Sequence, residues 1–180
     1  MIVTDKISAA KRQLKTAVKL FFNNDDDLSI HTLSGAALQI LHDIAEKMGL
    51  PSKLFLNSTM IRPEKMKEWN SDVVKHRNFL KHADRDAGDD MEFNPVINDF
   101  EILNAVMYYS QIVDSPEIDF EVYKMWFFLK HDNLLLQGGP LKEYIDSHRI
   151  NLPNHEDKEL FWDYIKMNRN FKIKIPIAGM

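Results

Sequence analysis

Apolar residues recur at three- and four-residue steps along almost the whole chain of 180 residues. This spacing places them on one face of an α-helix, which a soluble protein buries by packing the helix against others. The first such stretch runs from Ile7 to Phe21, and the second from Ile30 to Met48. The pattern therefore predicts an all-α protein folded as an antiparallel helical bundle.

Turn-forming residues divide the pattern into separate helices. Thr4 is expected to cap the first helix, and the run NNDDD at 23–27 ends it. Ser29 is expected to begin the second, which Gly49 ends, and Pro63 fits the first turn of a third. Further helices are predicted at residues 96–114, 117–136, 140–148 and 155–168.

The chain is long enough for one domain with its own core, and we expect it to have two parts. Residues 1–136 are predicted to form the bundle, with a buried helix around 125–129, which is apolar nearly all round. Residues 137–180 are predicted to form a C-terminal helical extension and tail packed on the same domain. Within it, 171–177 alternates apolar residues with Lys or Pro, like a strand that lacks a visible partner strand.

Composition and charge limit the function. A formal net charge of −4 gives no overall attraction for nucleic acid, so any RNA chemistry must come from a local basic patch. The absence of cysteine excludes disulfides, thiolate metal sites and cysteine nucleophiles. Charges near the N-terminus argue against a secretory signal, and no apolar run approaches the ~18 residues that span a bilayer. We expect a soluble, cytoplasmic protein without membrane contact.

The most unusual stretch of the chain is HRNFLKHADR, residues 76–85. On a helix, Asn78 and His82 lie on one face, and the long Arg77 side chain reaches the same region. An arginine can grip phosphate oxygens with two donors, and a histidine can move protons near neutral pH. The basic residues of the stretch, histidines included, are His76, Arg77, Lys81, His82 and Arg85.

Such a set suits cleavage of RNA, in which the 2′-hydroxyl is the nucleophile and no metal is needed. His82 could take the 2′-hydroxyl proton or give one to the departing 5′-oxygen. The reaction needs both an acid and a base, and two copies related by a two-fold axis would supply two histidines. The chemistry therefore favours a homodimer with a shared site and no metal or other cofactor.

The sequence RNFLKH at residues 77–82 resembles the R-x(4–6)-H motif of the HEPN family, in which a polar residue usually follows the arginine. The resemblance implies a dimeric helical bundle that cleaves RNA without metal, with Arg77 binding phosphate, His82 as acid or base and Asn78 orienting the site. It also implies a toxin, defence or RNA-processing role, with an antitoxin or regulatory protein as a possible partner. The residues expected to contact RNA are Lys81, Arg85 and His76.

Other interpretations of these residues stay open. The bundle could bind a nucleotide, RNA or protein without cleaving it, or the motif could be a basic helix end that complements the helix dipole. His76 falls on the apolar stripe of its helix, which favours a buried or interface histidine. Arg149 and His155 also have the motif spacing, but Pro153 between them argues against a shared helix.

A metal-binding bundle is a third interpretation, from another functional class. His31 and His42 share a helix face and could bind a metal together with Asp43 or Glu46. However, bundle metal sites usually repeat Glu-x-x-His, and this chain contains no such sequence. Gly35, followed by two alanines, is better explained by a close contact between helices.

Overall fold

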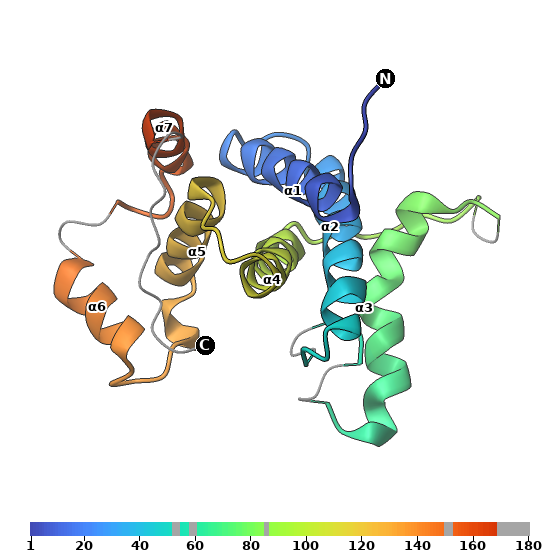
Figure 1. The fold of residues 1–180 in the computed structure, drawn as a ribbon. Coiled ribbons are helices and arrows are strands. Elements are labelled where there is room, and N and C mark those ends of the chain that lie inside the picture. Colours follow the sequence, from blue (N-terminus) through green and yellow to red (C-terminus); the bar gives the residue numbers. More distant parts are fainter. Residues whose placement is uncertain (52–54, 58–60, 85–86, 150–152, 169–180) are drawn as a thin grey trace.

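The computed structural model describes residues 1–51, 55–57, 61–84, 87–149 and 153–168. Within these ranges every regular element is a helix, so the predicted all-α bundle is confirmed (Figure 1). The elements are α1 (Lys6–Phe22), α2 (Asp27–Lys47), the 3₁₀ turn η1 (Pro63–Lys65), α3 (Met66–Lys81), α4 (Val96–Ile112), α5 (Ile118–Lys130), the 3₁₀ turn η2 (Asp132–Leu134), α6 (Pro140–His148) and α7 (Lys158–Asn168).

The core lies between α1, α2, α4 and α5. α2 packs along both α1 and α4, and α4 lies between α2 and α5 (Figure 1). Aromatic rings join the elements: Phe21 of α1 meets Trp126 of α5 edge-on, with 4.5 Å between ring centroids, and Phe22 stacks on Phe161 of α7 at 5.8 Å. α7 therefore belongs to the same core as the bundle. A domain boundary at residue 136 stays a prediction.

Carboxylates, not hydroxyls, cap the first two helices. Asp5 accepts a hydrogen bond from the Ser8 backbone N–H at 2.8 Å, and Asp26 accepts one from that of Ser29 at 2.7 Å. The prediction that Thr4 caps α1 is therefore wrong by one residue, and α2 begins before Ser29. An aspartate is as good a cap as threonine or serine, and its charge also interacts favourably with the helix dipole.

Most of the other predicted boundaries hold. Gly49 has φ +74° at the end of α2, and Pro63 opens the 3₁₀ turn that leads into α3. The helix expected at 117–136 is shorter, because α5 ends at Lys130 and the turn η2 follows. The strand pattern at 171–177 lies outside the described residues.

α3 differs from the other long helices because it lies at the edge of the bundle, against α2 (Figure 1). Two side chains tie it to the segment after α2. The Trp69 indole N–H donates to the Phe55 carbonyl at 2.8 Å, and the Asn70 amide bonds to Asn57 at 2.9 and 3.0 Å. The residue of α3 that is buried is Arg77. None of the described helices is both long enough and apolar enough to cross a bilayer.

Candidate functional site

The R-x(4–6)-H stretch lies at the C-terminal end of α3. Asn78 is in the last turn, whereas His82 is the C-cap, with an extended backbone and its N–H donated to the Asn78 carbonyl at 3.0 Å. The placement of His82 within the helix is thus wrong by one residue, because the extended backbone turns the chain out of the helix there. Asn78, Lys81 and His82 are exposed, and Arg85 lies outside the described residues.

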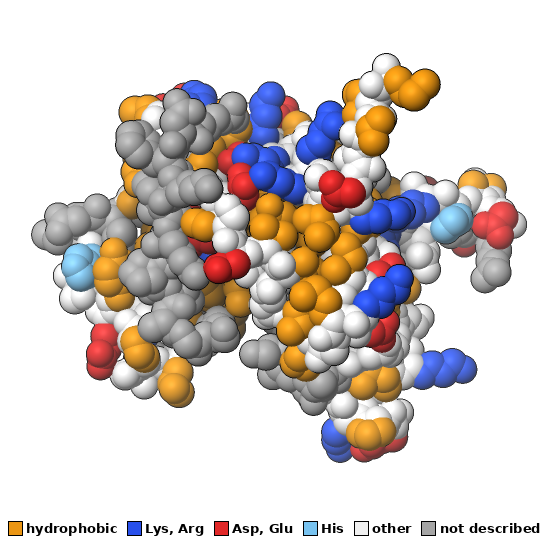
Figure 2. All heavy atoms as spheres, viewed as in Figure 1, with side chains coloured by type: hydrophobic (Ala, Val, Ile, Leu, Met, Phe, Trp, Pro, Cys, Tyr) orange, Lys and Arg blue, Asp and Glu red, His pale blue; other side chains and the backbone are white. Residues whose placement is uncertain are grey.

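The surface around this end of α3 is mixed in charge. In Figure 2, basic and histidine side chains lie beside acidic ones where α3 gives way to the following loop. A hollow of about 680 Å³ lies between α3 and that loop. Its lining residues are Ser71, Val74, Lys75, Asn78, Phe79, Asp89, Asp90, Met91 and Glu92. On the α3 side the hollow therefore offers a lysine (Lys75), an amide (Asn78) and an aromatic ring (Phe79). On the loop side it has three carboxylates.

Arg77 points the other way, into the bundle, with only 6% of its surface exposed. Its guanidinium donates to the Gly35 carbonyl at 3.3 Å and to Gln39 Oε1 at 2.9 Å, and it lies 5.3 Å from the centre of the Phe55 ring. Arg77 therefore fastens α3 to α2 in this conformation. Its role as a phosphate ligand stays a prediction.

Gly35 makes this approach possible. A Cβ atom at this position would lie 3.0 Å from Arg77 Cδ and 3.2 Å from Glu101 Oε1. Side chains from α3 and α4 thus meet at the same point of α2, which confirms the predicted close contact between helices at Gly35.

Glu101 of α4 is a site residue that the sequence did not reveal. Its carboxylate is 8% exposed and accepts a hydrogen bond from Ser34 Oγ at 2.5 Å. Burial raises the pKa of Glu101 to about 7, against the opposing effects of the Ser34 hydrogen bond and the nearby Arg77 charge. A carboxyl group with such a pKa can hold or release a proton at neutral pH.

His31 of α2 completes this group of polar side chains. Its Nδ1 lies 3.3 Å from Glu101 Oε1 and 3.2 Å from Asn98 Oδ1, and the imidazole is 1% exposed. Burial lowers the pKa of His31 to about 4, so its ring is neutral at pH 7. We call the set His31, Ser34, Arg77, Asn98 and Glu101 the polar cluster; it joins α2, α3 and α4.

A sequence signal for the polar cluster does exist. His31 and Ser34 fall at positions that the apolar period of α2 makes buried, and Asn98, Asp99 and Glu101 are polar residues at buried positions in the first turns of α4. Burying a polar group is costly unless it has a partner. Polar residues at buried positions of two helices therefore indicate that the helices meet there, although the sequence does not say which residues pair.

His76 and His42 have different surroundings. His76 is half-buried, and its ring meets those of His31 and Phe93 edge-on, at 6.1 and 5.6 Å between centroids. His42 lies 3.4 Å from the Tyr108 hydroxyl. Metal ligands do not gather around these histidines: the described part of the chain holds no group of three or more His, Asp or Glu side chains that could hold an ion.

The second pair with the motif spacing is not on one helix. Arg149 is the C-cap of α6 and donates to Asp132 at 2.5 Å, whereas His155 lies in the turn before α7.

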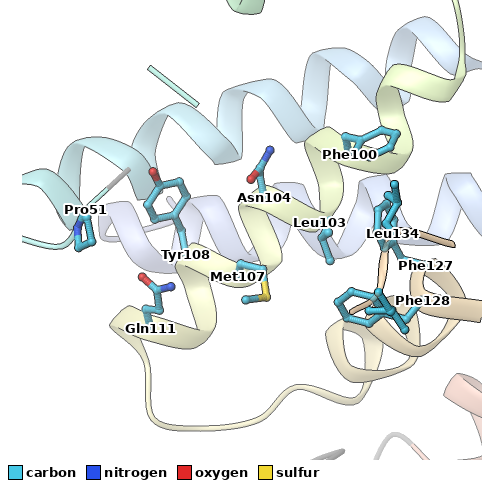
Figure 3. A pocket seen from close by; sticks show the side chains of 11 residues that line it. Pro51, Phe100, Leu103, Asn104, Met107, Tyr108, Gln111, Phe127, Phe128 and Leu134 are labelled. Atoms are coloured by element: carbon cyan, nitrogen blue, oxygen red, sulfur yellow. The ribbon is translucent and has the colours of Figure 1, made fainter. Parts of the chain in front are cut away.

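A separate apolar pocket of about 240 Å³ opens between α4, α5 and η2 (Figure 3). Phe100, Leu103 and Met107 of α4 face Phe127 and Phe128 of α5 across it, with Asn104 and Gln111 at its edge. The pocket contains no charged side chain and none of the polar cluster. It is therefore unsuited to phosphate chemistry.

Comparison of the chain with protein-family models, with curated proteins and with solved structures finds no match.

Proposed function

We propose that this protein is a HEPN-like endoribonuclease that cleaves RNA without a metal ion, through Arg77 and His82 at the end of α3. The observation that carries the proposal is the position of Arg77, which belongs both to the R-x(4–6)-H sequence and to the polar cluster. Buried charges cost folding free energy, so a buried arginine near a glutamate of raised pKa is more typical of a functional site than of a surface helix.

The proposed reaction is a transesterification within the RNA. The ribose 2′-hydroxyl attacks the adjacent phosphorus, and the 5′-oxygen leaves, giving a 2′,3′-cyclic phosphate and a 5′-hydroxyl. His82, exposed at the C-cap of α3, gives the proton to the leaving oxygen. Arg77 is 6% exposed and bonded to α2, so it can bind a phosphate oxygen only when α3 moves away from α2 and uncovers its guanidinium.

The hollow beside α3 supports RNA as the substrate. Phe79 offers a ring on which a base can stack, Lys75 offers a charge for phosphate, and Asn78 offers an amide that can bond to a base or sugar. The carboxylates on its far side repel phosphate, which favours binding of a base on that side. A homodimer, as the HEPN resemblance implies, would place the C-terminal ends of two α3 helices, one from each copy, in one cleft.

The test is cleavage of a mixed tRNA and mRNA pool in EDTA by the wild type and by His82→Ala. We expect the wild type to leave 2′,3′-cyclic phosphate ends and His82→Ala to be slower by about 10²–10⁴-fold, the usual contribution of a general acid or base. His148→Ala is the matched control, because His148 is likewise an exposed histidine at a helix end. Equal rates for the two variants, or an inert wild type at several pH values, would contradict the proposal.

One observation favours a second function, binding without cleavage. Because Arg77 is bonded to α2, its first role is to hold α3 in place. The same surface would then bind RNA, a nucleotide or a protein. Binding of labelled RNA separates the two functions: in a nuclease, His82→Ala loses cleavage and keeps binding, whereas Arg77→Ala weakens both.

A further inference from the structure

The apolar pocket between α4, α5 and η2 has no part in the proposed cleavage of RNA. Its volume of about 240 Å³ limits what it can hold (Figure 3). A dry cavity of about 150 Å³ in a protein core is known to bind benzene, whereas sites for drug-sized ligands occupy roughly 300–1,000 Å³. The pocket lies between these sizes, so it suits a molecule of one or two rings.

The walls of the pocket are buried and hold one another in place. Phe127, Phe128 and Leu103 line it and are only 2%, 5% and 8% exposed. The Phe127 ring meets those of Phe100 and Phe128 edge-on, with 5.3 and 5.5 Å between centroids. The rim offers little surface, mainly at Leu134, which is 58% exposed. A stable protein interface buries roughly 1,200 Å² or more, so a small molecule fits this pocket better than a partner protein.

The side chains that face the pocket favour an aromatic ligand. Phe100 of α4 and two phenylalanines of α5 present their rings to it, and Met107 adds a thioether. Aromatic rings attract the edges and faces of other rings in addition to the burial of apolar area. A methionine sulfur also makes favourable contacts with rings, and its unbranched side chain adapts to the shape of the ligand.

The pocket also selects against charge. None of the described residues that line it is charged, and burying an ionised group without a partner is very unfavourable. The polar side chains at its edge include the amides of Asn104 and Gln111, and Gln111 is exposed at the rim. An amide can both donate and accept a hydrogen bond, so one hydroxyl or N–H group of a ligand can be bonded there.

We propose that this pocket binds an uncharged aromatic small molecule of one or two rings that carries a single hydroxyl or N–H group. The rings lie between the phenylalanines of α4 and α5, and the polar group points to the amides at the edge. The pocket shares no residue with the polar cluster or with the hollow beside α3. The proposal is therefore independent of the proposed cleavage of RNA.

The test is titration calorimetry of the full chain with 2-naphthol, which has fused rings, a hydroxyl and no charge at pH 7. 2-Naphthoate replaces the hydroxyl with a carboxylate, and 1-octanol replaces the rings with an alkyl chain. Leu134→Asp places a charge on the rim, and Leu136→Asp is its control, at a leucine that is 81% exposed outside the pocket. Met107→Trp fills the pocket, and Met48→Trp, at an exposed methionine elsewhere, is its control. Circular dichroism checks that each variant is folded.

We expect one molecule of 2-naphthol to bind per chain, and 2-naphthoate and 1-octanol to bind about tenfold more weakly or not at all. Leu134→Asp should weaken the binding of 2-naphthol by about fivefold or more, Met107→Trp should abolish it, and both controls should bind like the wild type. Equal affinity for 2-naphthoate or 1-octanol, or no saturable binding of 2-naphthol, would overturn the proposal.

Sedimentation of the same variants tests whether another copy of the chain occupies the pocket. We expect Leu134→Asp and Leu136→Asp to have the same oligomeric state as the wild type. If Leu134→Asp alone converted a dimer to a monomer, a second copy would cover the pocket, and the small-molecule site would be refuted.

Discussion

α1 and α3 are helices of similar length, but different kinds of interaction hold them against the rest of the protein. α1 buries six apolar side chains, whereas the buried residue of α3 is the arginine of the candidate site. Apolar burial is worth about 1.5–3 kcal/mol for each large side chain, while a net hydrogen bond contributes about 0.5–1.5 kcal/mol. The buried residues of α1 are Ala10, Leu14, Ala17, Val18, Phe21 and Phe22.

The difference indicates two levels of stability in one chain. Elements held by few apolar contacts open locally at lower free energy than the global unfolding of the core. α3 is such an element, and the groups that hold it, Arg77 above all, are those of the candidate site. Changes in α1 should therefore unfold the protein, and changes in the polar cluster should release α3.

The largest effect is expected from Leu14→Ala in α1. Leu14 is fully buried, and truncating a buried leucine costs about 2–5 kcal/mol through lost burial and the cavity that remains. Urea unfolding followed by circular dichroism measures the loss. Leu136→Ala, at a leucine that is 81% exposed, is the control and should change the free energy of unfolding little. Similar effects of the two would refute the assignment of the core.

A smaller effect is expected from pH, because Glu101 and His31 act in opposite directions. The folded-state pKa of Glu101 is raised from 4.5 to about 7, so its contribution to stability is present below pH 4.5 and is lost as pH rises through 7. The pKa of His31 is lowered from 6.5 to about 4, so its contribution is present above pH 6.5 and is lost as pH falls through 4.

Glu101→Gln removes one of these two contributions. We expect its stability relative to the wild type to rise with pH between 4.5 and 7, by an amount on the order of 3 kcal/mol at most. Urea unfolding at half-unit pH steps measures this, with Glu121→Gln as control. A difference that stays constant across this range would show that Glu101 titrates normally.

The smallest effect on global stability is expected from Gly35→Ala. The added Cβ would crowd Arg77 at 3.0 Å and Glu101 at 3.2 Å, while alanine favours the helix by about 1 kcal/mol over glycine. The two terms offset each other in the unfolding free energy, but the crowding acts on side chains of α3 and α4, and of these two helices α3 is the one held by few apolar contacts. Hydrogen exchange should therefore quicken in α3 and not in α1. Gly88→Ala, whose Cβ would meet nothing within 4 Å, should leave exchange in both helices unchanged.

The fold was more predictable than the site, for a physical reason. The period of apolar residues is a property of each helix alone, so the helices and the buried run 126–129 could be predicted from local sequence. The polar cluster depends on which helices meet. Glu101 lies 67 residues from Ser34 in the sequence, and only the packing of α4 on α2 brings them within 2.5 Å. The motif singled out Arg77 from the sequence, but it did not predict that the Arg77 side chain points into the bundle.

Trp69 is a fluorophore within α3, and its indole N–H donates to the Phe55 carbonyl. Its emission therefore depends on whether α3 keeps this contact. Of the three tryptophans, Trp126 and Trp162 are 1% and 7% exposed in the core, whereas Trp69 sits in α3 itself. When α3 leaves α2, the Trp69 emission should shift to longer wavelength and become accessible to iodide quenching, while the other two stay shielded. The protein thus carries a native optical reporter of the movement of its candidate site, and no label is needed.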